Sequence, residues 1–297
     1  MNHMERVLVY GASGVQGGAV ARLLIEQGFG VRTVTRSEQK AEALRQQGIE
    51  AFVGNMDNPD ALVEAHVGVD KVFLNLPIEF DLSNLSTYAA NTVEAAKRAG
   101  VKLIVVNSNG FLPEEPSGFE SLDIKLQMIE QVKASGIPWI VVKPTLYLEN
   151  LLIPGVVGQE ALAYPIPADK PIAWISSEDA AQYHAYALSH AELAGRTLHA
   201  SGGEALTGIE LAARFSEALG RKITFLSLPY EHFEAGLSAV MAAETAAGVT
   251  GFYRWIGSEI DSLVLKNEAD RATRSLLKLT PVADWIRKPD ILPAFNG

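Results

Sequence analysis

Short apolar runs alternate with amphipathic stretches along the first half of the chain. The apolar runs, read as strands, occupy residues 7–10, 30–35, 49–53, 71–76, 102–107 and 139–143. The stretches between them have apolar residues at helical spacing, at residues 15–27, 38–47, 59–67, 84–98 and 117–134. Near-continuous apolar strands separated by helices are typical of a parallel sheet covered on both faces. The pattern therefore predicts an α/β fold with a doubly wound parallel sheet.

The rhythm changes after Pro144. Residues 151–171 are rich in Gly, Pro and apolar residues, which predicts a long irregular segment that serves as a binding wall or a partner surface. Beyond it we expect a helix at 176–190, a strand at 197–200, a capped helix at 207–219, a short strand at 222–226 and a mostly helical tail at 230–279. This predicts a first domain, residues 1–150, and a smaller α+β domain, residues 151–297, with residues 172–200 returning to the first sheet.

Two capping boxes are predicted at helix starts. In this motif a Ser or Thr precedes a Glu by three residues, and each side chain bonds the other residue's backbone N–H. Ser117 with Glu120 is expected to open the helix that ends near residue 134, and Thr207 with Glu210 to open the helix that ends near residue 219.

A glycine-rich turn joins the first predicted strand to the first predicted helix. Gly11, Gly14 and Gly17 follow one another at intervals of three, in the strand–turn–helix context of a dinucleotide-binding turn. Glycine lets the chain turn sharply and lets a pyrophosphate approach the backbone, while free N–H groups at the helix start attract phosphate. The predicted cofactor contacts in this turn are Gly11, Ser13, Gly14, Val15, Gln16 and Gly17. The alternative is an ordinary turn before a helix that tolerates glycine.

The residue after the second strand indicates which dinucleotide is bound. An NAD-selective site carries a carboxylate there for the ribose 2′-hydroxyl, whereas this chain has Arg36 followed by Ser37. An arginine can pair with a 2′-phosphate, so NADP(H) is favoured over NAD(H). Ser37 is expected to add a hydroxyl contact. The alternative for Arg36 is a solvated side chain at a strand end.

The other strand ends supply the remaining candidates, because ligands of an open parallel sheet bind beyond the carboxyl ends of its strands. Asn55 is expected to bond the adenine edge, or else to cap the helix that begins at Pro59. Ser108 follows the fifth strand near the expected nicotinamide position, although Ser is also an ordinary turn former. The cofactor contacts predicted at these ends are Asn55, Leu76, Pro77, Ser108 and Pro144.

Composition narrows the classes of function. The net charge is −10 and the pI about 5.2, which opposes nucleic-acid binding because that needs a basic face. The absence of cysteine excludes disulfides, thiolate metal sites and thiol catalysis. His184 and His190 are six residues apart, so they do not share a helix face as zinc ligands would, and no metal is expected. No apolar run is long enough to span a membrane, and we expect a cytoplasmic protein.

Several motifs, taken in order, resemble the NmrA-like group of atypical short-chain dehydrogenase/reductases. They are the glycine turn at residues 11–17, the helix that bears Lys125, and the segments at residues 135–138, 143–150 and 206–210. The resemblance covers about residues 4–235. It implies a Rossmann domain with a small C-terminal domain and NADP(H) in a cleft. It also implies one of two functions, because some members are quinone or dye reductases and others only sense the cofactor.

The chain departs from the wider superfamily at its proton donor. That superfamily uses a Tyr-x-x-x-Lys motif, and here Ser121 stands four residues before Lys125. None of the eight tyrosines is followed by a lysine at that spacing. A serine hydroxyl is a far weaker acid than a phenol. The reduction of a simple ketone would therefore lack its usual proton donor here. Isoflavone-reductase-like relatives also keep the lysine without the tyrosine, which implies that Lys125 steadies the nicotinamide ribose and the developing charge.

These observations predict an NADPH-dependent reductase of a small conjugated acceptor, such as a quinone, a dye or an enone. Lys125 is its expected catalytic residue, and Asn109, Tyr147 and Asn150 are expected to line the acceptor pocket. The alternative for Lys125 is a surface lysine on an amphipathic helix. The alternative for the whole chain is a non-enzymatic NADP(H) sensor that binds another protein, with a relative that has lost the cofactor as a third reading. A homodimer is left open.

Overall fold

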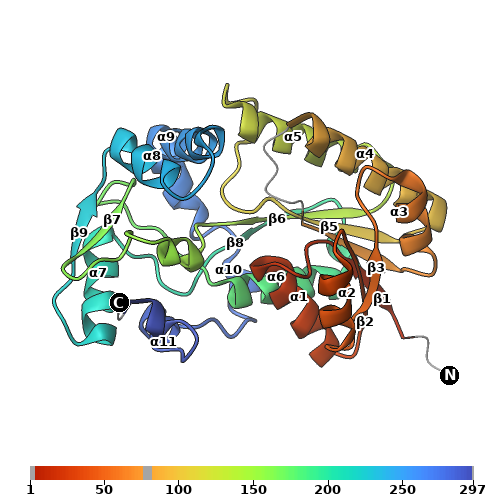
Figure 1. Cartoon of the computed structure of the whole chain (residues 1–297), viewed down its shortest axis with the longest axis horizontal. Helices are drawn as coiled ribbons and strands as arrows, with labels where there is room; N and C mark the ends of the chain where they lie inside the picture. Colours follow the sequence, from red (N-terminus) through yellow and green to blue (C-terminus); the bar gives the residue numbers. More distant parts are fainter. Residues whose placement is uncertain (1–3, 76–81, 296–297) are drawn as a thin grey trace. The chain divides into compact units, whose positions relative to one another are not determined.

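The computed structural model describes residues 4–75 and 82–295, and its largest sheet has seven strands (Figure 1). These lie in the order β3-β2-β1-β4-β5-β6-β8. Neighbouring strands from β3 to β6 are all parallel. The strands are β1 Arg6–Val9, β2 Gly30–Thr35, β3 Glu50–Val53, β4 Lys71–Leu74, β5 Leu103–Asn107, β6 Trp139–Pro144 and β8 Thr197–Ala200.

Helices cover both faces of this sheet. Figure 1 shows α1, α2 and α6 on one face and α3, α4 and α5 on the other. Their bounds are α1 Val15–Glu26, α2 Glu38–Arg45, α3 Pro59–His66, α4 Leu82–Ala99, α5 Glu120–Lys133 and α6 Ser177–Ser189. The predicted α/β fold with a doubly wound parallel sheet is therefore confirmed.

The core lies between the sheet and these two helix layers. Val7, Leu8 and Val9 of β1 have no exposed surface, and every residue of β4 and β5 is buried. Each large apolar side chain buried in this way stabilises the fold by about 1.5–3 kcal/mol. Such strands cannot lie at a solvated face, which is why the sheet needs helices on both sides.

The chain divides into two compact units. Unit 1 contains residues 1–116, 122–143 and 180–198, and unit 2 contains residues 117–121, 144–179 and 199–297. The glycine turn, Arg36 and Lys125 belong to unit 1. Tyr147 and Asn150 belong to unit 2. The assignment of a cofactor domain to residues 1–150 and a substrate domain to residues 151–297 stays a prediction.

Unit 2 corrects the expectation of an irregular segment at residues 151–171. This stretch contains β7, Ala161–Tyr164, which pairs in parallel with β9, Thr224–Ser227. The 3₁₀ helix η1, Leu148–Leu152, overlaps the start of the segment at residues 151–171. The remaining helices of the unit are α7 Gly208–Leu219, α8 Tyr230–Ser238, α9 Ala243–Lys266, α10 Arg271–Arg274 and α11 Val282–Ile286, followed by the 3₁₀ helix η3 Leu292–Phe295. A further 3₁₀ helix, η2 Ala191–Leu193, lies in unit 1.

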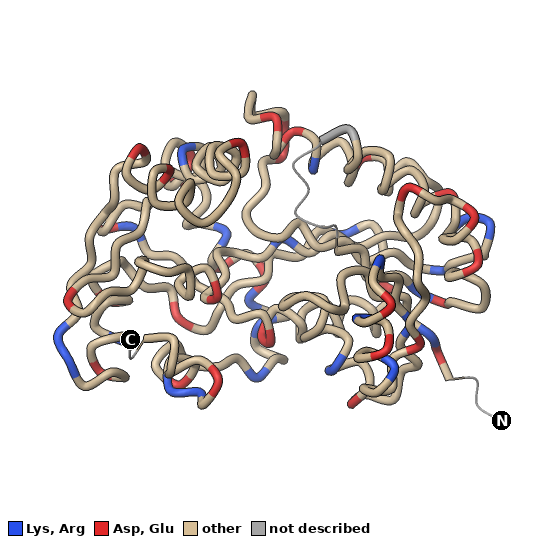
Figure 2. The backbone as a smooth tube through the Cα atoms, in the orientation of Figure 1, with Lys and Arg blue, Asp and Glu red and all other residues tan. Residues whose placement is uncertain are grey.

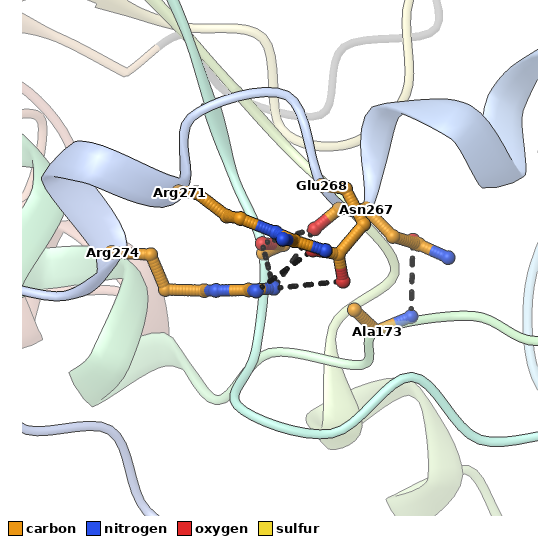
Figure 3. A network of polar contacts seen from close by, with 6 residues as sticks. Ala173, Asn267, Glu268, Arg271 and Arg274 are labelled. Carbon is orange, nitrogen blue, oxygen red and sulfur yellow. Dashed lines mark hydrogen bonds and ion pairs between the residues drawn. The ribbon is translucent and has the colours of Figure 1, made fainter.

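A buried asparagine fastens this corrected segment to the end of α9. Asn267 accepts a hydrogen bond from the Ala173 N–H at 3.1 Å and donates one to the Pro171 carbonyl at 2.9 Å. Its own carbonyl accepts from Arg274, and Arg274 pairs with Glu268 at 3.1 Å (Figure 3). The path of residues 171–173 is therefore set by a contact almost a hundred residues away in the sequence.

One predicted capping box forms and the other does not. The Thr207 hydroxyl accepts from the Glu210 N–H at 3.2 Å, and the Glu210 carboxylate accepts from the Thr207 N–H at 2.9 Å. The box at Ser117 is wrong, because α5 begins only at Glu120 and Ser117 Oγ accepts from the Phe119 N–H at 3.2 Å. Gly118 has φ +81°, which takes the chain out of a helical path between Ser117 and Glu120.

Charged residues of both signs are interspersed along the chain (Figure 2). Among the described residues, no helix has the length and apolar character needed to cross a membrane.

Candidate dinucleotide site

The glycine turn closes on itself so tightly that a side chain at its third glycine has no room. Gly11 has φ +76°, and its carbonyl accepts from the Gly14 N–H at 2.9 Å. A Cβ placed on Gly17 would lie 2.3 Å from the same carbonyl oxygen. The start of α1 therefore packs directly on the backbone of the turn, as the dinucleotide-binding motif requires.

The N-terminus of α1 is left open by its own sequence. Its N-cap, Gly14, is extended and has no side chain to cap the helix, and the first turn has no acidic residue. Val15 is 63% exposed, so the N–H groups of this turn are not covered by a large buried side chain. Unpaired N–H groups and the helix dipole together attract an anion such as a pyrophosphate.

Two arginines, Arg32 within β2 and Arg36 directly after it, have different surroundings. Arg32 is buried, and its guanidinium binds the Glu50 carboxylate and the Ala65 and Val67 carbonyls at 2.7–3.0 Å. Arg36 is exposed and forms no hydrogen bond or ion pair with the residues that the structure describes. Arg32 is thus structural, whereas the Arg36 guanidinium is available to a ligand.

Ser37 and Asn55 have local partners of their own. Ser37 is the N-cap of α2, and its hydroxyl oxygen accepts from the Lys40 N–H at 3.3 Å. Asn55 is half-buried, and its side-chain oxygen accepts from the Met56 N–H at 2.8 Å. The alternative role expected for Asn55 is wrong, because Asn58 caps the helix at Pro59 through the Ala61 N–H. The amide nitrogen of Asn55 and the hydroxyl hydrogen of Ser37 remain able to donate.

Beyond the turn, two asparagines that the sequence analysis did not select hold the strand ends together. Asn75 follows β4 and Asn107 ends β5. The Asn107 amide nitrogen donates to the side-chain oxygens of Gln16, at 2.8 Å, and Asn75, at 3.0 Å. A polar residue that closes an otherwise apolar buried strand is a signal that could have found both. Leu76 and Pro77, predicted as cofactor contacts, lie outside the described residues.

The loop after β5 begins with Ser108 and Asn109. Ser108 is buried, and its hydroxyl donates to the Gly110 carbonyl at 2.6 Å. Asn109 has φ +65°, a left-handed conformation uncommon outside glycine, and its N–H donates to the Asn107 side-chain oxygen at 3.0 Å. The loop is thus fixed by its own polar groups before any ligand is considered.

Further along, the same loop is tied to β6. Lys143 is 7% exposed and donates to the carbonyls of Leu112 and Pro113 at 3.3 and 3.4 Å. Its ammonium also pairs with the Glu114 carboxylate at 3.1 Å. Glu114 therefore neutralises a buried lysine.

Lys125 lies on α5 in unit 1. Its side chain is half-buried, and desolvation lowers the pKa of the amine from its usual value. It makes no hydrogen bond or ion pair with any described residue, whether of the glycine turn or elsewhere. The buried residues of this helix are Leu122, Met128, Ile129 and Val132. Lys125 is therefore an amine with reduced proton affinity and no protein partner in the described ranges.

Three of the predicted site residues, Pro144, Tyr147 and Asn150, belong to unit 2. Tyr147 is buried, Pro144 ends β6, and the Asn150 amide donates to the Tyr253 hydroxyl at 3.4 Å. The Tyr253 hydroxyl also bonds the hydroxyl of Tyr164, and burial raises the pKa of Tyr253 to about 12. The hydroxyl of Tyr253 therefore stays protonated at neutral pH.

The sheet order and the glycine turn together define a Rossmann-type dinucleotide-binding fold. The chain belongs to the NmrA-like family, whose model matches residues 3–283. The resemblance expected from the motifs is thereby confirmed.

Individual relatives are reductases by name. The chain is 30% identical over 243 residues to an NAD(P)H azoreductase of Xenophilus azovorans, covering 81% of this chain and 83% of the relative. It is 33% identical over 241 residues to a (4-alkanoyl-5-oxo-2,5-dihydrofuran-3-yl)methyl phosphate reductase of Streptomyces griseus, covering 80% of each. A solved structure of an Escherichia coli NADPH-dependent quinone oxidoreductase complexed with NADPH aligns with a TM-score of 0.78 at 25% identity, covering 94% of this chain and 98% of that one.

Proposed function

We propose that this chain is an NADPH-dependent reductase of a small conjugated acceptor, such as a quinone, a dye or an enone. The observation that carries the proposal is the glycine turn, where the Gly17 backbone lies against the Gly11 carbonyl and the start of α1 is free of caps and carboxylates. Such a turn fits a pyrophosphate. Lys125 and the named relatives support the proposed chemistry.

The residues of unit 1 suit each part of the cofactor. The N–H groups of the turn would hold the pyrophosphate, and the unpaired Arg36 would hold the 2′-phosphate that distinguishes NADP from NAD. Asn55 would bond the adenine, and Lys125 would bond the nicotinamide ribose. The assignment of Asn109, Tyr147 and Asn150 to the acceptor pocket stays a prediction.

Reduced nicotinamide supplies a hydride when it is bound. A neutral acceptor that receives hydride is left with a negative charge, which in a simple ketone sits on one oxygen and needs a strong proton donor at once, whereas a cationic dye that receives hydride becomes neutral. Ser121 cannot replace the missing phenol. A conjugated acceptor spreads the charge, and Lys125, with its lowered pKa, is suited to stabilise that charge and to yield a proton.

The names of the relatives favour the same class of acceptor. An azo group and a quinone are both conjugated. The dihydrofuranone in the Streptomyces griseus relative's name has a ring double bond next to carbonyl groups. All three can receive a hydride and delocalise the resulting charge, which is the property that the proposed site requires.

The first experiment is multiple-turnover oxidation of NADPH over a panel of quinones, azo and cationic dyes, and enones. We expect sustained turnover with at least one of these classes. We expect Lys125→Met to lower kcat at least tenfold, while Lys133→Met, at the end of the same helix, leaves it unchanged. NADPH binding without turnover on any acceptor would instead favour the sensor. Unchanged kcat and cofactor affinity in Lys125→Met would remove Lys125 from the mechanism.

Cofactor preference has its own test. Arg36→Ala is expected to weaken NADPH binding by about tenfold to a hundredfold and leave NADH binding unchanged, because a charge-assisted contact to phosphate is worth roughly 1.5–3 kcal/mol. The free energy of unfolding should stay the same, since Arg36 has no partner among the described residues. Equal losses for the two cofactors would show that Arg36 does not read the 2′-phosphate.

A further inference from the structure

One buried amide contacts two walls of the proposed cofactor site. Asn107 is 5% exposed, and its side chain forms three hydrogen bonds with described residues, all of them within unit 1. Its amide nitrogen donates to Gln16 and to Asn75, and its oxygen accepts from the Asn109 N–H. Both ends of the side chain are therefore engaged, which fixes its orientation.

The first wall is the glycine turn. Gln16 lies in the first turn of α1, one residue before Gly17. Asn75 packs on the turn from the side of β4, because a Cβ added to Gly11 would lie 2.9 Å from its amide nitrogen. Asn107 thus holds both the helix that follows the turn and the side chain against which the turn rests.

The second wall is the loop after β5. Its Asn109 adopts φ +65°, and the Asn109 N–H donates to the Asn107 side-chain oxygen. Without that acceptor, an N–H group next to a buried strand end would lose its partner. The same amide therefore also sets the start of the loop that lies, by strand order, on the nicotinamide side.

The direction of the Gln16 bond has a consequence for ligands. Because Gln16 accepts with its oxygen, its own amide nitrogen is turned away from Asn107. This nitrogen forms no hydrogen bond within the described parts of the chain, and Gln16 is half-buried beside the open N-terminus of α1. The two N–H donors of the Gln16 amide therefore lie next to the backbone N–H groups at the start of α1, which themselves suit an anion.

We propose that Asn107 is a positioning residue that orients the Gln16 amide toward the bound dinucleotide and holds the glycine turn and the loop after β5 in one arrangement. This inference rests on the proposed function, because it assumes that NADPH binds at the turn. Asn107 acts through Gln16 and Asn109 and is not itself a ligand of the cofactor.

The test is a double-mutant cycle on NADPH affinity, measured by fluorescence titration without any acceptor. Asn107→Leu removes the amide at similar volume, and Gln16→Met removes the donors that it orients. We expect Asn107→Leu to weaken NADPH binding about tenfold and Gln16→Met to weaken it about fivefold. Gln16→Met should then have no further effect in the Asn107→Leu background, because the orientation is already lost.

Thr250→Val is the matched control. Thr250 is fully buried in α9, and its hydroxyl donates to the Ala246 carbonyl at 2.8 Å, so the variant loses a buried hydrogen bond outside unit 1. It should unfold more easily yet bind NADPH as the unsubstituted chain does. Asn107→Leu that is folded and binds NADPH within twofold of the unsubstituted chain would overturn the inference, as would additive effects in the cycle.

The remaining outcomes are also decisive. If Asn107→Leu does not fold, Gln16→Met alone decides, and unchanged affinity in that variant overturns the inference. An unsubstituted chain that binds NADPH but reduces no acceptor removes the reductase proposal and leaves the cycle readable. An unsubstituted chain that does not bind NADPH overturns both proposals.

Discussion

The N-cap residues of α1 and α7 both have an extended backbone, but only the N-terminus of α7 is capped by side chains. At α7, the Thr207 hydroxyl and the Glu210 carboxylate satisfy each other's N–H groups. At α1, the N-cap Gly14 has no side chain, and no acidic residue is present in the first turn. The N-terminus of α7 is closed by its own residues, whereas the N-terminus of α1 is left open.

The difference shows what a binding site costs the fold. A Ser, Thr, Asp or Asn cap adds about 1 kcal/mol of stability, which α1 forgoes. The first turn of α1 also requires glycine at residue 17, where a Cβ would overlap the Gly11 carbonyl. Without a cap, α1 is less stable than it could be, but the N–H groups at its N-terminus stay free of a side-chain partner among the described residues. The two helix ends should respond in opposite ways to substitution, in affinity at α1 and in stability at α7.

The largest effect is expected from Gly17→Ala. The new Cβ would lie 2.3 Å from the Gly11 carbonyl oxygen, and a Cβ cannot rotate away. The turn must move, at a cost of about 1–3 kcal/mol in the free energy of unfolding. NADPH affinity should fall by about a hundredfold, since the N–H groups move with the turn. Urea unfolding and fluorescence titration measure the two quantities.

Gly248→Ala is the control for this substitution. Gly248 also lies within a helix, α9, but a Cβ there meets nothing within 4 Å. It should leave NADPH affinity unchanged and stabilise the helix by up to about 1 kcal/mol. Equal NADPH affinity in Gly17→Ala and Gly248→Ala would mean that the close approach at Gly17 does not shape the site.

Val15→Asp should affect affinity and stability with opposite signs. Val15 is the first residue of α1 and is exposed, so an aspartate there is favourable to the helix dipole by about 0.3–1 kcal/mol. The same charge repels a pyrophosphate, and NADPH should bind about fivefold more weakly for about 1 kcal/mol of repulsion. Val15→Asn, which has no charge, is the control, and salt should reduce the difference between the two variants. An aspartate variant that binds NADPH as well as the asparagine variant would contradict an anion site at this helix end.

The elements of unit 1 could be predicted because their signals are local. The strand expected at residues 30–35 is β2 with the same bounds. Gly30, at its start, and Ser37, the N-cap of the following helix α2, lie within the same short stretch. β7 escaped prediction because Ala161 and Ala163 occupy its half-buried positions, so the alternation of apolar and polar residues is absent. Its partner β9 also lies sixty residues further on, where no local pattern points to it.

The two capping motifs show the limit of a local pattern. Ser117-Gly118-Phe119-Glu120 and Thr207-Gly208-Ile209-Glu210 have the same form, yet only the second forms a box. Glycine accepts both helical and left-handed conformations at little cost, so tertiary packing decides. Gly208 lies against the Phe225 ring, where a Cβ would be 2.5 Å away, whereas Gly118 has nothing within 4 Å.

The candidate site was predictable to the same extent. The glycine turn and Arg36 follow from motif and spacing, and their roles as cofactor contacts stay predictions. Asn107 was not found because its partner Gln16 is 91 residues away in the sequence. A buried amide is significant only through its partners, and those are set by the order of the strands.

Removing the N-terminal cap of α7 should lower the free energy of unfolding and leave the affinity for NADPH unchanged. Thr207→Ala removes the hydroxyl that accepts from the Glu210 N–H, and the free energy of unfolding should fall by about 1 kcal/mol. NADPH affinity should not change. A measurable loss of affinity in this variant would show that the two helix ends are coupled, which would contradict the separation between a closed end and a binding end.

The smallest effect is a pH dependence at the same helix end. Hydrogen bonds from the Thr207 N–H and hydroxyl lower the pKa of the Glu210 carboxyl from its usual value of 4.5. A group whose pKa is lowered by folding stabilises the native state above its unfolded pKa, and this contribution disappears as the pH falls through the folded pKa. Glu210→Gln keeps an acceptor but loses the charge, so its Tm should lie below that of the unsubstituted chain at pH 7. The difference should shrink as the pH falls below 4.5, and a constant difference would mean that the charge of Glu210 does not stabilise α7.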